Sequence, residues 1–88
     1  MRYMVIETFN DGAAQAAYIR LKDKGRMLPD GLTYLDSWIN EDFSVCYQLM
    51  ECDDPRLFEP WIAAWSDLFS FEVVPVMSSA EASEIALG

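Results

Sequence analysis

Histidine is missing from all 88 residues, and this absence restricts the chemistry most. Without imidazole, haem iron loses its most common protein ligand, and no side chain has an ordinary pKa near 7 for acid–base work. Catalytic zinc mostly takes histidine or cysteine ligands, and the chain offers no histidine and only two cysteines for it. Any acid–base role therefore falls to a carboxyl group whose pKa is raised by the fold.

Cysteine is scarce, with only Cys46 and Cys52. Both fall in one expected strand, so at ~3.3 Å per residue their Cα atoms lie ~20 Å apart, whereas a disulfide requires less than ~7 Å. Two reduced thiols are expected. The acidic cluster at Glu51, Asp53 and Asp54 lacks the glycine turn of a calcium loop. We therefore predict no metal site and no cofactor.

Basic residues are few: six Lys and Arg stand against fifteen Asp and Glu, a formal net charge of −9. Such a chain repels polyanions, which excludes nucleic acid and anionic membrane as expected partners. No apolar run approaches the ~20 residues that span a bilayer. Residues 1–7 lack the apolar core and cleavage site of a signal peptide, so we expect a cytoplasmic protein.

Apolar side chains, in contrast, are abundant, at 52% of the residues, and 14% are aromatic. A domain of this length buries only about 60–65% of its unfolded surface. An apolar share this large in so short a chain suggests that association, as well as folding, buries surface.

Hydrophobic periodicity and turn residues divide the chain into strands and helices. Asn10 or Asp11 is expected to cap the first helix. Pro60 interrupts the second, so either a separate first turn over 55–58 or a kink is expected. Pro75 favours either an edge position or a bulge for the last strand. The expected elements are strand 3–9, helix 13–24, strands 31–39 and 43–52, helix 60–69 and strand 71–77.

The resulting order, βαββαβ, has essentially one compact right-handed solution. This is the ferredoxin-like α+β fold, with two helices on one face of a four-stranded antiparallel sheet. We expect residues 1–77 to form this single domain. Residues 78–88 form either a C-terminal tail or a short helix, since Ser78 and Glu81 fit the capping-box pattern.

The two middle strands are apolar on both faces. Tyr34 and Trp38 share one parity of residues 31–39, while Leu35 and Ile39 share the other, and the following strand repeats this pattern. Alternate residues lie on opposite faces of a sheet, and the helices of a small domain cover only one face. We therefore predict a homodimer that covers the open sheet face.

Five blocks of sequence occur in one collinear order: MRYMVIE (1–7), GRMLPDGL (25–32), DSW (36–38), WSDL (65–68) and FEVVPV (71–76). In these blocks the chain resembles an uncharacterised bacterial family, domain of unknown function 3303. The resemblance implies a place in the wider dimeric α/β-barrel group, whose ferredoxin-like subunits pair their sheets face to face. That group includes haem-degrading enzymes, quinol-type monooxygenases, lactone isomerases and polyketide cyclases, but the resemblance implies no particular reaction. Pro60 departs from the pattern where an ordinary helix former is expected.

Polar side chains among apolar neighbours in the strands are the candidates for a ligand or pocket site. Arg26, in a connecting loop, is the expected cationic partner of Asp36 or Glu7. Trp61 and Trp65 belong to the apolar stripe of the second helix and are assigned to the core. The aromatic candidates of the middle strands have cross-strand packing as their alternative role. The candidates are Glu7, Arg26, Tyr34, Asp36, Trp38, Tyr47, Gln48 and Glu72.

The sequence alone names no reaction. We interpret the chain as a small cytoplasmic homodimer that binds a small apolar molecule or acts as an interaction subunit. The alternative is a cofactor-independent monooxygenase-, isomerase- or cyclase-like enzyme that uses a strand carboxylate and a nearby tyrosine. A pocket with aromatic walls and a buried carboxylate favours catalysis, whereas a packed interior favours the structural role.

Overall fold

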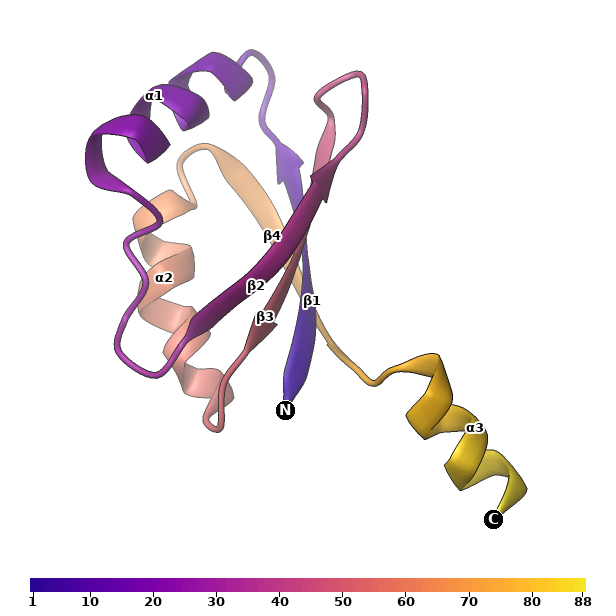
Figure 1. The fold of residues 1–88 in the computed structure, drawn as a ribbon. Helices are drawn as coiled ribbons and strands as arrows, with labels where there is room; N and C mark the ends of the chain where they lie inside the picture. Colours follow the sequence, from indigo (N-terminus) through magenta and orange to yellow (C-terminus); the bar gives the residue numbers. More distant parts are fainter.

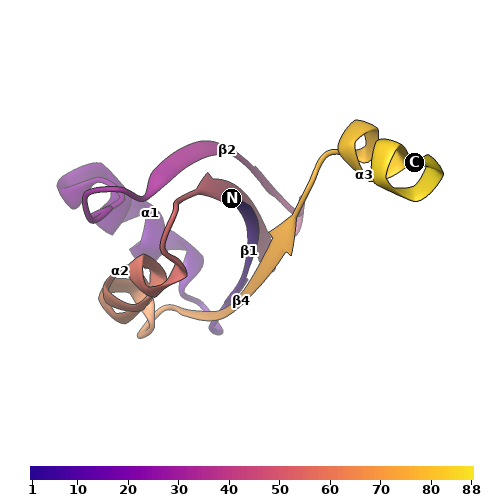
Figure 2. The ribbon, with the colours of Figure 1, turned by 90° about the horizontal axis from the view of Figure 1, so that it is seen from below.

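A computed structural model describes all residues, 1–88, and contains one sheet and three α-helices (Figure 1). The sheet order is β2-β3-β1-β4 with every neighbouring pair antiparallel, and α1 and α2 lie on the same face (Figure 2). This arrangement confirms the ferredoxin-like α+β fold. The elements are β1 (Arg2–Phe9), α1 (Ala14–Lys24), β2 (Thr33–Ile39), β3 (Val45–Glu51), the 3-10 turn η1 (Pro55–Leu57), α2 (Phe58–Trp65), β4 (Phe69–Val76) and α3 (Ser79–Leu87).

The start of α1 differs from the expectation. Its N-cap residue is Ala13, which has no capping side chain, and neither Asn10 nor Asp11 takes that role. The Asn10 side-chain amide instead donates to the carbonyl of Asp67 at 3.0 Å, which ties the loop before α1 to the segment after α2. Arg20 adds a second tie, since its guanidinium contacts both carboxylate oxygens of Asp67 at 2.8 and 2.6 Å. These contacts hold the two helices side by side over the sheet.

Of the two alternatives expected at the entry into α2, a separate turn or a kink, the structure has the separate turn. Asp54 caps η1 by accepting a hydrogen bond from the backbone N–H of Arg56 at 3.0 Å, and Pro55 occupies the first position of the turn. Pro60 falls in the first turn of α2, where its missing N–H breaks no intrahelical bond. Because α2 ends at Trp65, β4 begins at Phe69, two residues earlier than predicted. As expected from Pro75, β4 is an edge strand.

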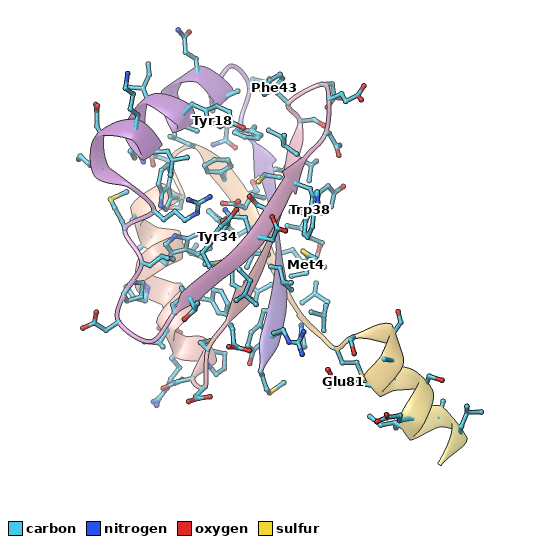
Figure 3. All side chains as sticks on the ribbon, viewed as in Figure 1. Met4, Tyr18, Tyr34, Trp38, Phe43 and Glu81 are labelled. Atoms are coloured by element: carbon cyan, nitrogen blue, oxygen red, sulfur yellow. The ribbon has the colours of Figure 1, made fainter.

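A β-bulge in β2 overturns the predicted parity of this strand. The register with β3 shifts between Tyr34 and Asp36, so Leu35 is an extra residue. Tyr34 therefore faces the helices, whereas Asp36 and Trp38 face the open side; Figure 3 shows Tyr34 and Trp38 pointing to opposite sides of β2. The prediction that Tyr34 and Trp38 share a face is wrong, because simple alternation cannot reveal an inserted residue.

The turn after β2 is also longer than expected. Phe43, predicted to begin the next strand, lies in this turn with a φ of 60°, and β3 starts at Val45. The Phe43 ring packs edge-on against Tyr18 of α1, with 6.3 Å between the ring centres. Figure 3 shows the two side chains together at one end of the sheet. This contact links α1 to the β2–β3 turn.

The core lies between the sheet and the pair α1 and α2. Val5, Met50 and Trp61 are almost completely buried, at 0, 0 and 2% exposure, and Trp65 is buried beside them. The assignment of Trp61 and Trp65 to the core is confirmed. Both cysteines are free thiols. None of the helices has the length and apolar character needed to pass through a lipid bilayer.

The opposite face of the sheet carries no helix of its own domain. Trp38, Tyr47, Ile6 and Glu72 are cross-strand neighbours and form one row over all four strands. We call this side the open face. Trp38 is 54% exposed there. The last helix, α3, projects from the end of β4 beyond this face, on the side away from α1 and α2 (Figure 2).

Candidate functional site

A cavity of about 100 Å³ lies between the sheet and the helices α1 and α2, and it is partly open to solvent. Most of its walls are apolar, and the few polar groups come from β1, β2, β3 and the loop after α1. We call it the Glu7 cavity. It is lined by Glu7, Phe9, Ala17, Tyr18, Leu21, Arg26, Ser37, Cys46, Gln48, Trp61, Trp65 and Phe69.

Glu7 is the only ionisable acidic or basic residue among the buried residues, and its exposure is 2%. It faces the helices because it shares the parity of Tyr3 and Val5 on β1. Gln48 Nε2 donates a hydrogen bond to Glu7 Oε1 from the neighbouring strand. Burial raises the pKa of the Glu7 carboxyl, and hydrogen bonds from Gln48 and Cys46 offset this increase only in part. Glu7 therefore keeps its proton at pH values where an exposed glutamate has lost it.

The thiol of Cys46 lies directly across from Glu7 in the β1–β3 register. Burial, together with the nearby Glu7 carboxyl, raises the pKa of the Cys46 thiol to about 12. Since the thiolate is the nucleophilic form, Cys46 is inert at neutral pH and acts as a weak hydrogen-bond donor to Glu7. Burial likewise raises the pKa of the Tyr18 phenol, which stays protonated in the cavity wall.

The main chain of Arg26 is held in place by two indole groups. Both Trp61 Nε1 and Trp65 Nε1 donate to the Arg26 carbonyl oxygen, at 3.0 and 3.1 Å. The next residue, Met27, has a φ of 58°, so the chain turns sharply here. The α2 tryptophans thus form core and cavity wall while fixing the loop that brings Arg26 to the cavity.

The side chain of Arg26 does not make the expected ion pair. Its guanidinium lies 3.6 Å from the centre of the Tyr34 ring, a cation–π contact, and neither Glu7 nor Asp36 comes within salt-bridge distance. The prediction of a pair with Asp36 or Glu7 is wrong for two reasons. Asp36 lies on the open face because of the bulge, and Glu7 is bonded to Gln48. The positive charge still lowers the Glu7 pKa slightly.

Two further polar groups shape the site. The Tyr34 hydroxyl and Ser37 Oγ share a hydrogen bond of 2.6 Å on the helix side of β2, which fixes the ring under Arg26. Gln48 Oε1 is buried and has no hydrogen-bond partner. A buried acceptor without a partner costs about 1–3 kcal/mol. A ligand hydroxyl or N–H in the cavity would satisfy it.

The structure divides the eight predicted site residues between the two faces of the sheet. Glu7, Arg26 and Gln48 line the cavity, and Tyr34 supports Arg26 beside it. The other four do not join them. The candidates on the open face are Asp36, Trp38, Tyr47 and Glu72.

The sequence reasoning missed several residues of the cavity wall. Ser37 was overlooked because the bulge inverts its face. Cys46 has the same parity as Gln48 on β3, so the strand pattern contained the signal for it. Tyr18 shares the helical spacing of Ala17 and Leu21, so the periodicity of the first helix contained the signal that it faces the sheet.

Replacing Arg26 with methionine is expected to lower the free energy of unfolding by about 0.5–2 kcal/mol, the range of a cation–π contact. Breaking a buried ion pair would cost more, about 3–5 kcal/mol. The loss is measured by chemical denaturation, with the exposed Lys24→Met as the matched control, expected to change stability by less than about 0.5 kcal/mol. A loss above 3 kcal/mol would show that Arg26 is paired with a buried carboxylate after all.

The protein is thus a small ferredoxin-like α+β domain. Its candidate site lies between the sheet and the helices and combines a buried carboxyl, a nearby guanidinium and an apolar cavity. A family model, a domain of unknown function named DUF3303, matches residues 1–88, and the chain belongs to this family. Comparisons with curated proteins and with solved structures gave no match.

Proposed function

We propose that the protein binds one small, largely apolar molecule in the Glu7 cavity and orients it through a single polar group. The observation that carries this proposal is a buried carboxyl, with its pKa raised by burial, in a cavity whose other walls are mostly apolar. An apolar pocket with a few convergent polar groups is the usual form of a small-molecule site.

The polar groups define the kind of ligand. A protonated Glu7 can donate a hydrogen bond through its second oxygen, and Gln48 Oε1 is free to accept one. A hydroxyl group satisfies both, because it donates and accepts at one atom. When Glu7 is protonated, which the raised pKa favours, the cavity holds no negative charge that an apolar ligand would have to desolvate.

The size of the cavity limits the ligand. An engineered apolar cavity of about 150 Å³ accepts benzene. The Glu7 cavity, at about 100 Å³, therefore holds a five-membered ring or a branched chain of similar size, and a longer molecule would extend through the opening to solvent.

Cyclopentanol is a probe of this size, and cyclopentane is its matched control without the hydroxyl. Cyclopentanol has six non-hydrogen atoms, and a binding free energy of about 0.7 kcal/mol for each corresponds to a Kd of about 1 mM. We expect titration followed by NMR to show saturable shifts for Glu7, Gln48 and the Trp61 and Trp65 indoles. Cyclopentane should bind at least about tenfold more weakly, since it leaves Gln48 Oε1 unsatisfied. Equal binding of the two would contradict the role of the polar groups.

The raised pKa of Glu7 favours a second candidate function, proton transfer in an isomerase-like reaction. A carboxyl group whose pKa is raised by burial in a cavity can act as a general acid or base, and Tyr18 is the tyrosine nearest to it in the wall. Cyclopentanone in D₂O tests this in the same NMR experiment. Exchange of its α-hydrogens for deuterium by the native protein, and not by Glu7→Gln, would make the site catalytic; no exchange leaves the binding function alone.

A further inference from the structure

We propose that α3 is an arm that packs against a second copy of this chain, in a homodimer whose two subunits stack their open faces. The proposal is independent of the cavity, which lies on the other side of the sheet. It accounts for two features that the monomer leaves unexplained: an apolar sheet face without a cover and a helix without a packing surface.

The open face offers an apolar centre with no charge in it. Its central residues are cross-strand neighbours from all four strands: Met4, Ile6, Trp38, Tyr47, Leu49 and Val74. The acidic residues of this face lie around that centre: Asp36 and Glu72 on the two edge strands, and Glu51 at the end of β3 opposite Arg2. Two such faces complement each other, because their apolar centres meet while their acidic margins stay near solvent.

The helix α3 makes almost no contact with its own domain. All of its residues are exposed, including Ile85 at 71% and Leu87 at 86%. The only side-chain hydrogen bond or ion pair between α3 and the body is an exposed one of 3.0 Å between Glu81 and Arg2. An isolated helix shorter than about 12 residues is marginal in water, even with the N-cap in which Ser78 Oγ accepts a hydrogen bond from the backbone N–H of Glu81. A nine-residue helix of this kind needs a packing surface.

The overall dimensions show how far the arm extends. The radius of gyration is 14.3 Å, compared with about 12 Å for a compact chain of 88 residues. The accessible surface is 5870 Å², compared with about 5,300 Å² for a compact protein of this mass. The excess, about 570 Å², is surface that the extended arm leaves uncovered, and it is more than half of the ~800 Å² that each partner buries in a standard interface.

The position of α3 indicates which occupant it meets. It projects beyond the sheet on the side of the open face (Figures 1 and 2), so a copy stacked on that face lies within its reach. Only Met77 and Ser78 separate it from β4, and Glu81 accepts a hydrogen bond from Arg2 at the root of the arm. The short connection and this bond hold the root of α3 beside the body, while Ile85 and Leu87 towards its far end stay exposed and free to meet a second copy.

Sedimentation of the full chain from 1 to 100 µM tests the dimer. We expect twice the chain mass, and a tighter dimer in 0.5 M than in 0.1 M NaCl, because salt screens the repulsion between two chains of net charge −9. The open-face variant Trp38→Ser should raise the dissociation constant at least tenfold. A monomer at 100 µM would overturn the proposal.

The arm is tested separately by the double variant Ile85→Ser with Leu87→Ser. We expect it to weaken the dimer at least tenfold, whereas Glu84→Gln, which removes a charge from α3 but no apolar surface, should not weaken it. Isotope-filtered NMR on a mixture of labelled and unlabelled chains should show contacts of the Ile85 methyls with the other copy. A dimer of unchanged affinity in the double variant, or Ile85 contacts only within one chain, would overturn the arm.

Discussion

Replacing Trp61 with alanine is expected to lower the free energy of unfolding by about 3–5 kcal/mol, a large part of the total for a domain of this size. Trp61 is 2% exposed, and its ring meets Phe58 and Phe71 edge-on, at 6.3 and 5.5 Å between centres. Its N–H also donates to the Arg26 carbonyl. The substitution thus removes core packing, a cavity wall and one anchor of the Arg26 loop together. Chemical denaturation measures the loss.

Trp61→Phe separates packing from anchoring and remains measurable if the alanine variant does not fold. It keeps an aromatic ring but lacks the N–H, while Trp65 still donates to the Arg26 carbonyl. We expect a loss of about 1–2 kcal/mol and a weaker response of the site to cyclopentanol. A loss below about 1 kcal/mol in Trp61→Ala would contradict the central place of this side chain in the core.

Replacing Glu7 with glutamine is expected to remove a pH dependence of stability. The Glu7 pKa is raised in the folded state above its ordinary value of 4.5. Between these two pKa values the folded chain holds a proton that the unfolded chain has released. The free energy of unfolding therefore falls as the pH rises through this window, by about 1.4 kcal/mol per pH unit, and Glu7 stabilises the fold fully only below the window.

Glutamine preserves the shape of the side chain but does not titrate, so Glu7→Gln should be more stable than the native protein at pH 7. Denaturation from pH 4.5 to 7.5 at one protein concentration measures how the free energy of unfolding changes with pH in the native protein and in Glu7→Gln. This range avoids the acidic region where the lowered pKa values of Asp42, Asp54 and Asp67 contribute. Glu72→Gln, an exposed carboxyl on the open face, should keep the native slope. The same slope in Glu7→Gln would mean that Glu7 is ionised in the fold.

The sequence was sufficient to predict the fold because each element had a strong local signal. The alternation of Tyr3, Val5 and Glu7 predicts one face of β1, and the spacing of Trp61 and Trp65 predicts the buried face of α2. Given these elements, the handedness of crossovers leaves one compact topology. Errors at the ends of elements, such as Phe43, arise where a turn with a positive φ replaces regular structure.

Only part of the site could be predicted, because its assembly depends on register and on loop geometry. The inserted residue at Leu35 places Ser37 and Tyr34 together on the helix side and moves Asp36 away. No pattern in the sequence shows that insertion. The position of Arg26 depends on two indole donors from a helix more than thirty residues away in the chain. Contacts of that kind emerge only from the folded packing.

Filling the Glu7 cavity tests the central claim, a binding site for a small molecule, most directly. Ala17 of α1 is 5% exposed and lines the cavity, while its neighbour Ala16 is exposed on the same helix. Ala17→Leu places three additional carbon atoms in the cavity, and Ala16→Leu adds the same atoms outside it. NMR titration with cyclopentanol should show binding to the native protein and to Ala16→Leu, and none to a folded Ala17→Leu. Unchanged binding to Ala17→Leu would contradict the assignment of the ligand to this cavity.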